Sequence, residues 1–301
     1  MQKQIVIIIT VLLCFLNIKA DESILPGVAV FSRAGPAKAK GYPSIYINPA
    51  GLTVNKTSSI IISQARLYYD TYAYDVGFLY NQDIAFAFGF YQKNKKNVAI
   101  KKILLNPDNT PQIDPVTGTI KEEIIGFSDR IESSGNIAFG KDIFNNVSAG
   151  IVARLRHIQH SSNYALAFGV NAGVNIKLMD LRIGISITET GRTQYNWSDK
   201  REEYEPMQAN AGIEYKLFDK LLLLAGVANV FDNENKINWG LGTEIEIFKV
   251  FLLRTGFYDN KIRIGFKFVI DKLNIEYAFI GNSDFYDANR IGIEYAFNNF
   301  Q

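Results

Sequence analysis

Arg290-Ile291-Gly292-Ile293-Glu294-Tyr295-Ala296-Phe297, near the end of the 301-residue chain, is the stretch that decides the fold. Its apolar residues alternate one by one with charged or small residues. Because successive side chains of a β-strand point to opposite faces, this alternation predicts a strand with one apolar face and one polar face. The same pattern recurs at residues 164–176, 181–187, 237–247 and 262–268. We therefore expect a protein that is built from strands.

The length and the composition of these strands favour a membrane barrel. They run for about ten residues, which is what a tilted strand needs to cross a bilayer, whereas soluble strands average about five or six. Their polar faces carry glycine and charges of both signs, as a lumen would. The chain also holds 16 Tyr and 21 Phe, and membrane barrels place aromatic residues at both interfaces. A soluble β-sandwich or propeller is the alternative, and we expect an all-β, transmembrane antiparallel β-barrel.

A count by alternation gives fourteen strands, near residues 57–69, 71–81, 83–93, 123–141, 146–158, 163–177, 180–189, 205–217, 220–231, 236–248, 250–258, 260–269, 272–280 and 288–298. The connections sort by parity, because the long ones, 94–122, 190–204 and 281–287, all follow odd-numbered strands. Bacterial outer-membrane barrels have an even number of strands, short periplasmic turns and longer outer loops. Both chain ends are therefore expected on the periplasmic side.

The first 20 residues are predicted to be a secretory signal peptide. Lys3 gives a positive start, residues 5–16 form an apolar run, and Ala20 is the expected last residue before cleavage. Cys14, the only cysteine, lies in that run, so the mature chain is expected to have no disulfide and no thiol chemistry. The predicted organisation is a signal peptide at 1–20, an N-terminal hatch or plug segment at 21–55 and an outer-membrane β-barrel at 56–301.

The segment Asn48-Pro49-Ala50-Gly51-Leu52 interrupts the pattern of strands. Pro49 and Gly51 break regular structure, and the flanking residues Ile45 and Ile47 are apolar. Such a segment is too irregular for a strand and too apolar for an idle tail. Because both chain ends are expected on the periplasmic side, the segment is predicted to enter the barrel from below and to act as a hatch.

The C-terminal pattern Tyr295-Ala296-Phe297 resembles the signal with which barrels enter the outer-membrane assembly machinery. An aromatic residue usually ends that signal, whereas here Phe300 is followed by Gln301. Phe297 is therefore the expected anchor. The expected location is the bacterial outer membrane, with outer-membrane lipid and the barrel assembly machinery as partners.

Several segments resemble a known family. Ala37-Lys38-Ala39-Lys40-Gly41, followed by Ile47-Asn48-Pro49-Ala50-Gly51-Leu52, resembles the N-terminal block of the outer-membrane proteins related to the long-chain fatty acid transporter FadL. The match is closer to their PorV/PorQ-like (UPF0164) branch, in which an aromatic residue stands where this chain has Ile47. Residues 180–187, 210–215, 252–258 and 275–279 are similar to later strands of the family.

The resemblance implies a fourteen-stranded barrel with an N-terminal hatch, and two possible functions. FadL-type members pass hydrophobic small molecules across the outer membrane, and this is the function we expect. PorV-type members bind protein cargo of a secretion system at the cell surface, which is the alternative, together with a purely structural role. Family analogy also places a kink in strand three, at residues 83–91, where Gly89 would allow one.

Charged residues on the predicted inner faces are expected to pair across the lumen, because an unpaired buried charge is costly. A water-filled polar channel is the alternative, although open porins usually have roughly 16 strands or more. The predicted lumen charges are Arg154, Arg156, Arg182, Glu214, Lys216, Glu244, Glu246, Arg263, Lys267, Glu276, Arg290 and Glu294.

The sequence predicts no enzyme, metal site or cofactor. His157 and His160 lie near Ser161 and Ser162 at the outer end of strand five, but no separately placed acid or asparagine completes a triad. Two histidines without a Cys or acidic neighbour at ligand spacing do not predict a metal site. The net charge of +2 gives no sign of nucleic-acid binding.

Overall fold

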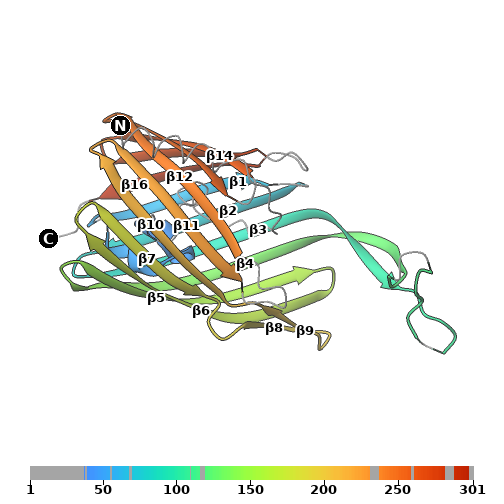
Figure 1. The fold of residues 1–301 in the computed structure, drawn as a ribbon. Helices are drawn as coiled ribbons and strands as arrows, with labels where there is room; N and C mark the ends of the chain where they lie inside the picture. Colours follow the sequence, from blue (N-terminus) through green and yellow to red (C-terminus); the bar gives the residue numbers. More distant parts are fainter. Residues whose placement is uncertain are drawn as a thin grey trace.

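Sixteen antiparallel strands make up most of this computed structural model (Figure 1). The structure describes residues 37, 39–54, 56–67, 70–108, 110–115, 119–230, 237–258, 261–281 and 288–297. The predicted signal peptide and most of the predicted loop 281–287 lie outside these residues. The strands are β1 (Ser58–Arg66), β2 (Thr71–Asn81), β3 (Ile84–Ile103), β4 (Glu122–Phe144), β5 (Val147–His160), β6 (Asn163–Leu178), β7 (Leu181–Thr188), β8 (Thr193–Trp197), β9 (Glu202–Glu205), β10 (Gln208–Phe218), β11 (Leu221–Val230), β12 (Ile237–Phe248), β13 (Phe251–Tyr258), β14 (Lys261–Ile270), β15 (Leu273–Ile280) and β16 (Ala288–Phe297).

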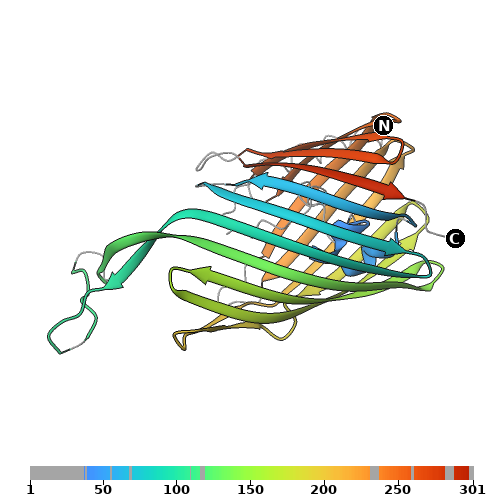
Figure 2. The same cartoon turned by 180° about the vertical axis from the view of Figure 1, so that it is seen from behind.

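All the strands except β8 and β9 form one closed ring. Each pairs with its neighbour in the chain, β7 pairs with β10, and β1 pairs with β16 from Ser58↔Phe297 to Arg66↔Asn289. The prediction of a fourteen-stranded barrel is therefore confirmed, and most predicted strand ends lie within two or three residues of the observed ones. Short turns gather at one end of the barrel, here called the short-turn end, and the opposite end is called the arm end (Figure 2).

The outer face of the wall is apolar, as the alternation predicts. On β16, Ile291 and Ile293 are about half exposed (50% and 49%). Arg290, which precedes Ile291 on the same strand, is 1% exposed and points inward. A belt of such side chains surrounds the barrel, and these are the groups that lipid covers in a membrane-spanning barrel. No helix among the residues described here is long and apolar enough to cross a membrane.

The predicted loop 94–122 begins too early, because β3 continues to Ile103, whereas β4 begins at Glu122, next to its predicted start. Strand β3 is 20 residues long and β4 is 23, and their ladder continues from Val98↔Ser128 to Ile103↔Glu122 after a register shift. Because about ten residues suffice to cross a bilayer, the end of β3 and the beginning of β4 project beyond the wall as a two-stranded ribbon (Figure 2). We call residues 96–129 the outer arm. Val98, Ile100 and Phe127 keep a strand-like composition there, and the turn-forming residues are confined to its tip.

The kink expected in strand three is absent. The β2–β3 ladder runs without a shift from Thr71↔Lys95 to Asn81↔Ala85, and the β3–β4 ladder runs without a shift from Ile84 to Lys95. The wall is therefore closed along residues 84–95. Gly89 pairs with Gly77 across the ladder. Both glycines face the ring of Tyr42 inside the barrel, and neither marks a bend of the strand.

The predicted loop 190–204 contains two short strands, which is a further difference. Strand β8 pairs with β6 at Ala165–Ala167, and β9 pairs only with β8. Together they form a hairpin, here called the roof hairpin, that lies at the arm end of the barrel (Figure 1). Tyr195 and Trp197 on β8 alternate inward and pack on Ile158 and Ala165, which explains why this stretch becomes a strand.

Candidate functional site

A short irregular segment lies inside the barrel (Figures 1 and 2). It consists of two 3-10 helices, η2 (Tyr42–Tyr46) and η3 (Pro49–Thr53), whose residues are all buried. Each helix has a proline in its first turn, where the missing N–H costs nothing. Asn48 caps η3, because its side chain accepts a hydrogen bond from the backbone N–H of Ala50 at 3.2 Å. We call residues 39–54 the N-terminal segment.

Glycines on the inner face of the wall allow this segment to approach the strands closely. A Cβ added at Gly77 would lie 1.9 Å from Cζ of Tyr42, and one added at Gly150 would lie 2.4 Å from the carbonyl carbon of Pro49. Neither position has room for a side chain. The five wall glycines that contact the segment in this way, here called the glycine surface, are Gly77, Gly89, Gly140, Gly150 and Gly173. The glycines noted within strand-like runs thus have a packing role.

Hydrogen bonds from side chains hold the segment in place. The hydroxyls of Tyr42 and Tyr46 both donate to Oδ1 of Asp75 on β2, at 2.8 Å each. Asn48 Nδ2 donates to Oδ1 of Asn175 on β6 at 2.8 Å. Because the segment is made of 3-10 helices and not of a strand, its attachment depends on these local bonds and on packing.

The backbone of η3 is held in the same way. Asn81 Nδ2 donates to the carbonyl of Leu52 at 2.8 Å, and Ser148 Oγ donates to the carbonyl of Ala50 at 3.2 Å. The geometry of the motif Asn48–Leu52 also depends on Gly51, where an added Cβ would lie 2.0 Å from the carbonyl oxygen of Ala39. The five motif residues therefore contact the wall or the rest of the N-terminal segment.

Most of the predicted lumen charges face inward. On the β12–β16 side, Arg254 Nε is 2.6 Å from Glu244, and Lys267 Nζ is 3.2 Å from Glu276 and 3.8 Å from Glu294. This cluster lines the wall opposite the glycine surface. Arg254 was not among the predicted residues, although it alternates inward on β13 and bridges Glu244 to Glu276 at 3.3 Å.

The remaining predicted charges lie in several places. Arg182 pairs with Glu214 at 3.0 Å, and Lys40 of the N-terminal segment pairs with the same carboxylate at 2.9 Å. Arg263 and Arg290 are buried, and Arg290 Nε donates to Ser63 at 3.3 Å. Glu246 is half-buried towards the short-turn end. The lumen position predicted for Lys216 is wrong, because the side chain is exposed at the β10–β11 turn and pairs with Asp219.

A cavity of about 350 Å³ opens above the N-terminal segment at the arm end, and we call it the vestibule. Tyr46 lies at its floor, Tyr91 and Arg156 line its walls, and Tyr195 and Glu205 of the roof hairpin cover it. The lining therefore combines aromatic rings with charged groups. Its charges are largely paired with each other, since Lys93 and Arg130 both contact Glu132.

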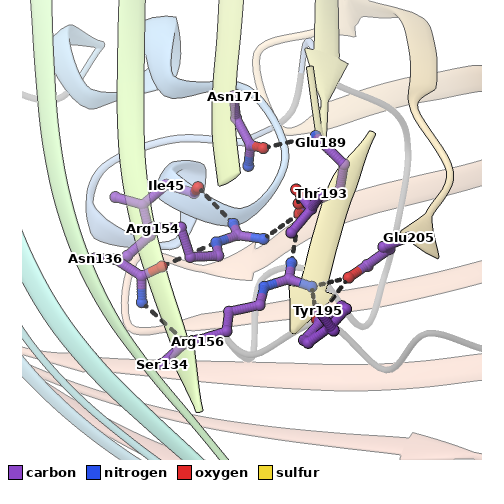
Figure 3. A network of polar contacts seen from close by, with 10 residues as sticks. All are labelled: Ile45, Ser134, Asn136, Arg154, Arg156, Asn171, Glu189, Thr193, Tyr195 and Glu205. Carbon is purple, nitrogen blue, oxygen red and sulfur yellow. Dashed lines mark hydrogen bonds and ion pairs between the residues drawn. The ribbon is translucent and has the colours of Figure 1, made fainter. Parts of the chain in front are cut away.

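Glu189, immediately after β7, joins two of the predicted arginines (Figure 3). Its side chain is 2% exposed, and its Oε1 accepts from Arg154 Nη1 at 2.9 Å and from Arg156 Nη2. Its Oε2 accepts from the hydroxyl of Thr193, and its backbone N–H donates to Oδ1 of Asn171 at 3.0 Å. The residue has a left-handed backbone with φ 55°, which is uncommon outside glycine.

Glu189 is not among the predicted lumen charges, because its position falls at the end of the predicted strand 180–189. One signal was available. Arg154 and Arg156 lie two residues apart on one polar face, and two buried arginines require a nearby acid. The same reasoning applies to Glu205, whose Oε2 accepts hydrogen bonds from Arg156 Nη1 and from the hydroxyl of Tyr195.

The histidines lie half-buried at the arm end of β5, and the C-terminal signal lies on the outside of the wall. His157 stacks on Tyr164 with ring centroids 6.3 Å apart, and the backbone N–H of Ser161 donates to Ser128. Tyr295 faces outward, and Phe297 stacks on Phe78 at 6.1 Å. No group of three or more His, Cys, Asp or Glu residues that is suited to a metal ion occurs in the described part of the chain.

This closed fourteen-stranded barrel is similar in fold to solved outer-membrane transport barrels of the FadL type. The Pseudomonas putida toluene transporter TodX is similar with a TM-score of 0.60 and 10% identity, over 93% of this chain and 99% of that chain. A Pseudomonas aeruginosa FadL homologue is similar with a TM-score of 0.52 and 12% identity, over 93% and 98%. Similarity at these identities concerns the fold. No family model and no curated protein matches the sequence.

Proposed function

We propose that this protein is a bacterial outer-membrane channel that passes small hydrophobic molecules carrying a polar group. The observation that carries the proposal is the vestibule above the N-terminal segment. The segment lies in the lumen and is not part of the wall. The apolar outer belt, the short turns at one end and the predicted signal peptide support the location. Outer-membrane lipid and the barrel assembly machinery are then the expected partners.

The lining of the vestibule favours a small ligand. Its volume of about 350 Å³ is near the lower end of the roughly 300–1,000 Å³ range of ligand pockets. Tyr46, Tyr91 and Tyr195 contribute aromatic rings to the lining, and Ile158 adds apolar surface. Because the charges of the lining are paired, an uncharged ligand with one hydrogen-bonding group fits better than an ion. TodX is by name a toluene transporter, and a single-ring compound has the corresponding size.

The route that we propose runs along the barrel axis. The ladders on both sides of β3 are continuous, so the wall provides no opening at the position expected from family analogy. A ligand that leaves the vestibule towards the short-turn end meets Tyr46 and then the rest of the N-terminal segment. Passage therefore requires this segment to move, which is the role of a hatch within the predicted residues 21–55.

Uptake measurements test this function. Cells that carry the gene should take up radiolabelled p-cresol faster than cells that lack it. Tyr91→Ala removes one ring from the vestibule and should reduce the gene-dependent uptake roughly tenfold, which corresponds to about 1.4 kcal/mol of binding. Tyr215→Ala is the matched control, because Tyr215 faces outward and is 44% exposed. Equal uptake with and without the gene, or equal effects of the two substitutions, would contradict the proposal.

The outer arm favours a second candidate, the binding of a protein partner at the cell surface as in PorV-type proteins. Leu105, Ile113 and Phe127 on the arm are 50%, 62% and 64% exposed. Contiguous exposed apolar surface beyond the membrane is typical of interaction sites. The two functions are separable, because removal of the arm would abolish partner binding and leave uptake intact.

A further inference from the structure

We infer that Glu189 couples the roof hairpin to the N-terminal segment, so that a ligand that displaces the roof also releases the segment. The network consists of Glu189, Arg154 and Arg156, and we call it the coupling network (Figure 3). The inference rests on the proposed function in one respect, namely that the segment moves during passage. It adds the residues that transmit the signal.

The inner half of the network holds the N-terminal segment. Arg154 Nη2 donates to the carbonyl of Ile45 at 3.4 Å, and its guanidinium lies 5.8 Å from the ring centroid of Tyr46. Its Nε donates to Asn136 at 2.9 Å. A guanidinium buried to this extent is stable only beside a counterion, and Glu189 is the carboxylate that it contacts. The grip of Arg154 on the segment therefore depends on Glu189.

The outer half of the network holds the roof hairpin. Arg156 Nη1 donates to the hydroxyl of Tyr195 at 2.7 Å and to Glu205, one residue from each strand of the hairpin. Thr193, at the start of β8, donates its hydroxyl to Oε2 of Glu189. A ligand that moves the roof would therefore withdraw Thr193 from the Glu189 carboxylate and, through Glu205 and Tyr195, pull the side chain of Arg156 on β5 away from it.

Glu189 is the joint because both arginines share its Oε1 atom. Once the roof groups leave, the carboxylate is free to follow them towards solvent, and Arg154 loses its counterion. Desolvation then disfavours the position of Arg154 in the lumen, and its bond to Ile45 is lost. Gly169 leaves space for the Glu189 carboxylate in the network, since an added Cβ at this position would lie 2.6 Å from Oε2 of Glu189.

The charge cluster on the opposite wall has a different arrangement and supplies the control. Glu276 is also a buried carboxylate bound by two cations, Arg254 at 3.3 Å and Lys267 at 3.2 Å. Its described contacts reach neither the roof hairpin nor the N-terminal segment. Glu276→Gln therefore changes a carboxylate of the same kind without touching the coupling.

Conductance of the purified full-length protein in planar bilayers tests the inference. Glu189→Gln and Arg154→Gln should raise the open probability on the order of tenfold, because each breaks a buried ion pair that holds the closed state. Glu205→Gln with Thr193→Val should do the same from the roof side. Glu276→Gln should match the parent. Closed channels in Glu189→Gln, or equal leak in Glu276→Gln, would overturn the inference.

A labelling experiment covers the case in which a variant assembles poorly. Ser44 is fully buried in the segment, and Ser44→Cys introduces a thiol of nearly the same size. In the folded fraction, isolated by its heat-modifiable gel mobility, maleimide should label this thiol about tenfold faster when Glu189→Gln is added. An unchanged labelling rate would overturn the inference. If Glu189→Gln leaks but the parent does not take up p-cresol, the coupling is supported and the proposed uptake function is refuted. Failure of the coupling and failure of the proposed function are therefore distinguishable.

Discussion

At the scale of single residues, the contact between the N-terminal segment and the wall depends on glycines, which have no side chain to hold the segment away from the strands. Gly150 on β5 faces the backbone of Pro49 and Ala50, and Gly77 faces the ring of Tyr42. Both glycines lie in regular strands, where glycine weakens the ladder. The loss is offset by the close packing of an apolar segment whose residues Tyr42, Ile45 and Leu52 are completely buried.

Gly150→Ala should displace the segment while leaving the barrel assembled. The added Cβ would meet the Pro49 carbonyl carbon at 2.4 Å, and overpacking of this kind costs about 1–3 kcal/mol. We expect increased sensitivity of cells to a bulky antibiotic such as vancomycin. Gly135→Ala on β4 is the control, since nothing lies within 4 Å of its added Cβ. Equal sensitivity of the two variants would refute the contact. Gly51→Val should act like Gly150→Ala.

Asp75 gives a second prediction at this scale, because it accepts hydrogen bonds from both Tyr42 and Tyr46. Asp75→Ala leaves two buried hydroxyls without this acceptor, at a cost of about 1–3 kcal/mol for each unsatisfied group. Trypsin cleavage after Lys40 should become faster. Asp75→Asn keeps Oδ1 as an acceptor and should have a smaller effect. The reverse order of the two rates would contradict the role assigned to Asp75.

At the scale of elements, alternation predicts the strands well because one face of each meets lipid and the other meets the lumen. The segment around Asn48–Leu52 is recognised for the opposite reason, since Pro49 and Gly51 exclude a strand. Alternation does not tell where a ladder stops, so Val98–Ile100 is missed as part of β3, whereas the start of β4 is predicted correctly. Contacts between distant elements, such as Arg154 with Glu189, depend on the closure of the ring, so the sequence signals that Arg154 and Arg156 need an acid but not which acid it is.

Replacement of residues 98–127 by a tight turn should leave the barrel intact. The remaining ladders of β3 and β4, from Ile84↔Lys141 to Lys95↔Arg130, close the wall by themselves. The shortened protein should keep its heat-modifiable mobility and its uptake of p-cresol. Loss of uptake in a correctly assembled barrel would show that the outer arm belongs to the channel. That result would contradict both a separate role of the arm in partner binding and the axial route that we propose.

At the scale of the whole molecule, the lumen is divided into two halves. The N-terminal segment packs against β2–β6 through the glycine surface, and paired charges line the wall from β12 to β16. Lys40 extends the contacts of the segment to Glu214 on β10, which lies between the two halves. In the function that we propose, passage along the axis needs the segment to leave its contact with β2–β6, and the vestibule and the coupling network lie where a ligand would trigger that movement.

A reversible cross-link between the segment and the wall tests this central claim most directly. The side chains of Asn48 and Asn175 meet at 2.8 Å, so Asn48→Cys with Asn175→Cys brings two thiols close enough for a short bis-methanethiosulfonate reagent to join them through reducible bonds. Uptake of p-cresol should stop in the cross-linked protein and return when the cross-link is reduced, while each single variant should transport in both conditions. Undiminished uptake in the fully cross-linked double variant would contradict the account.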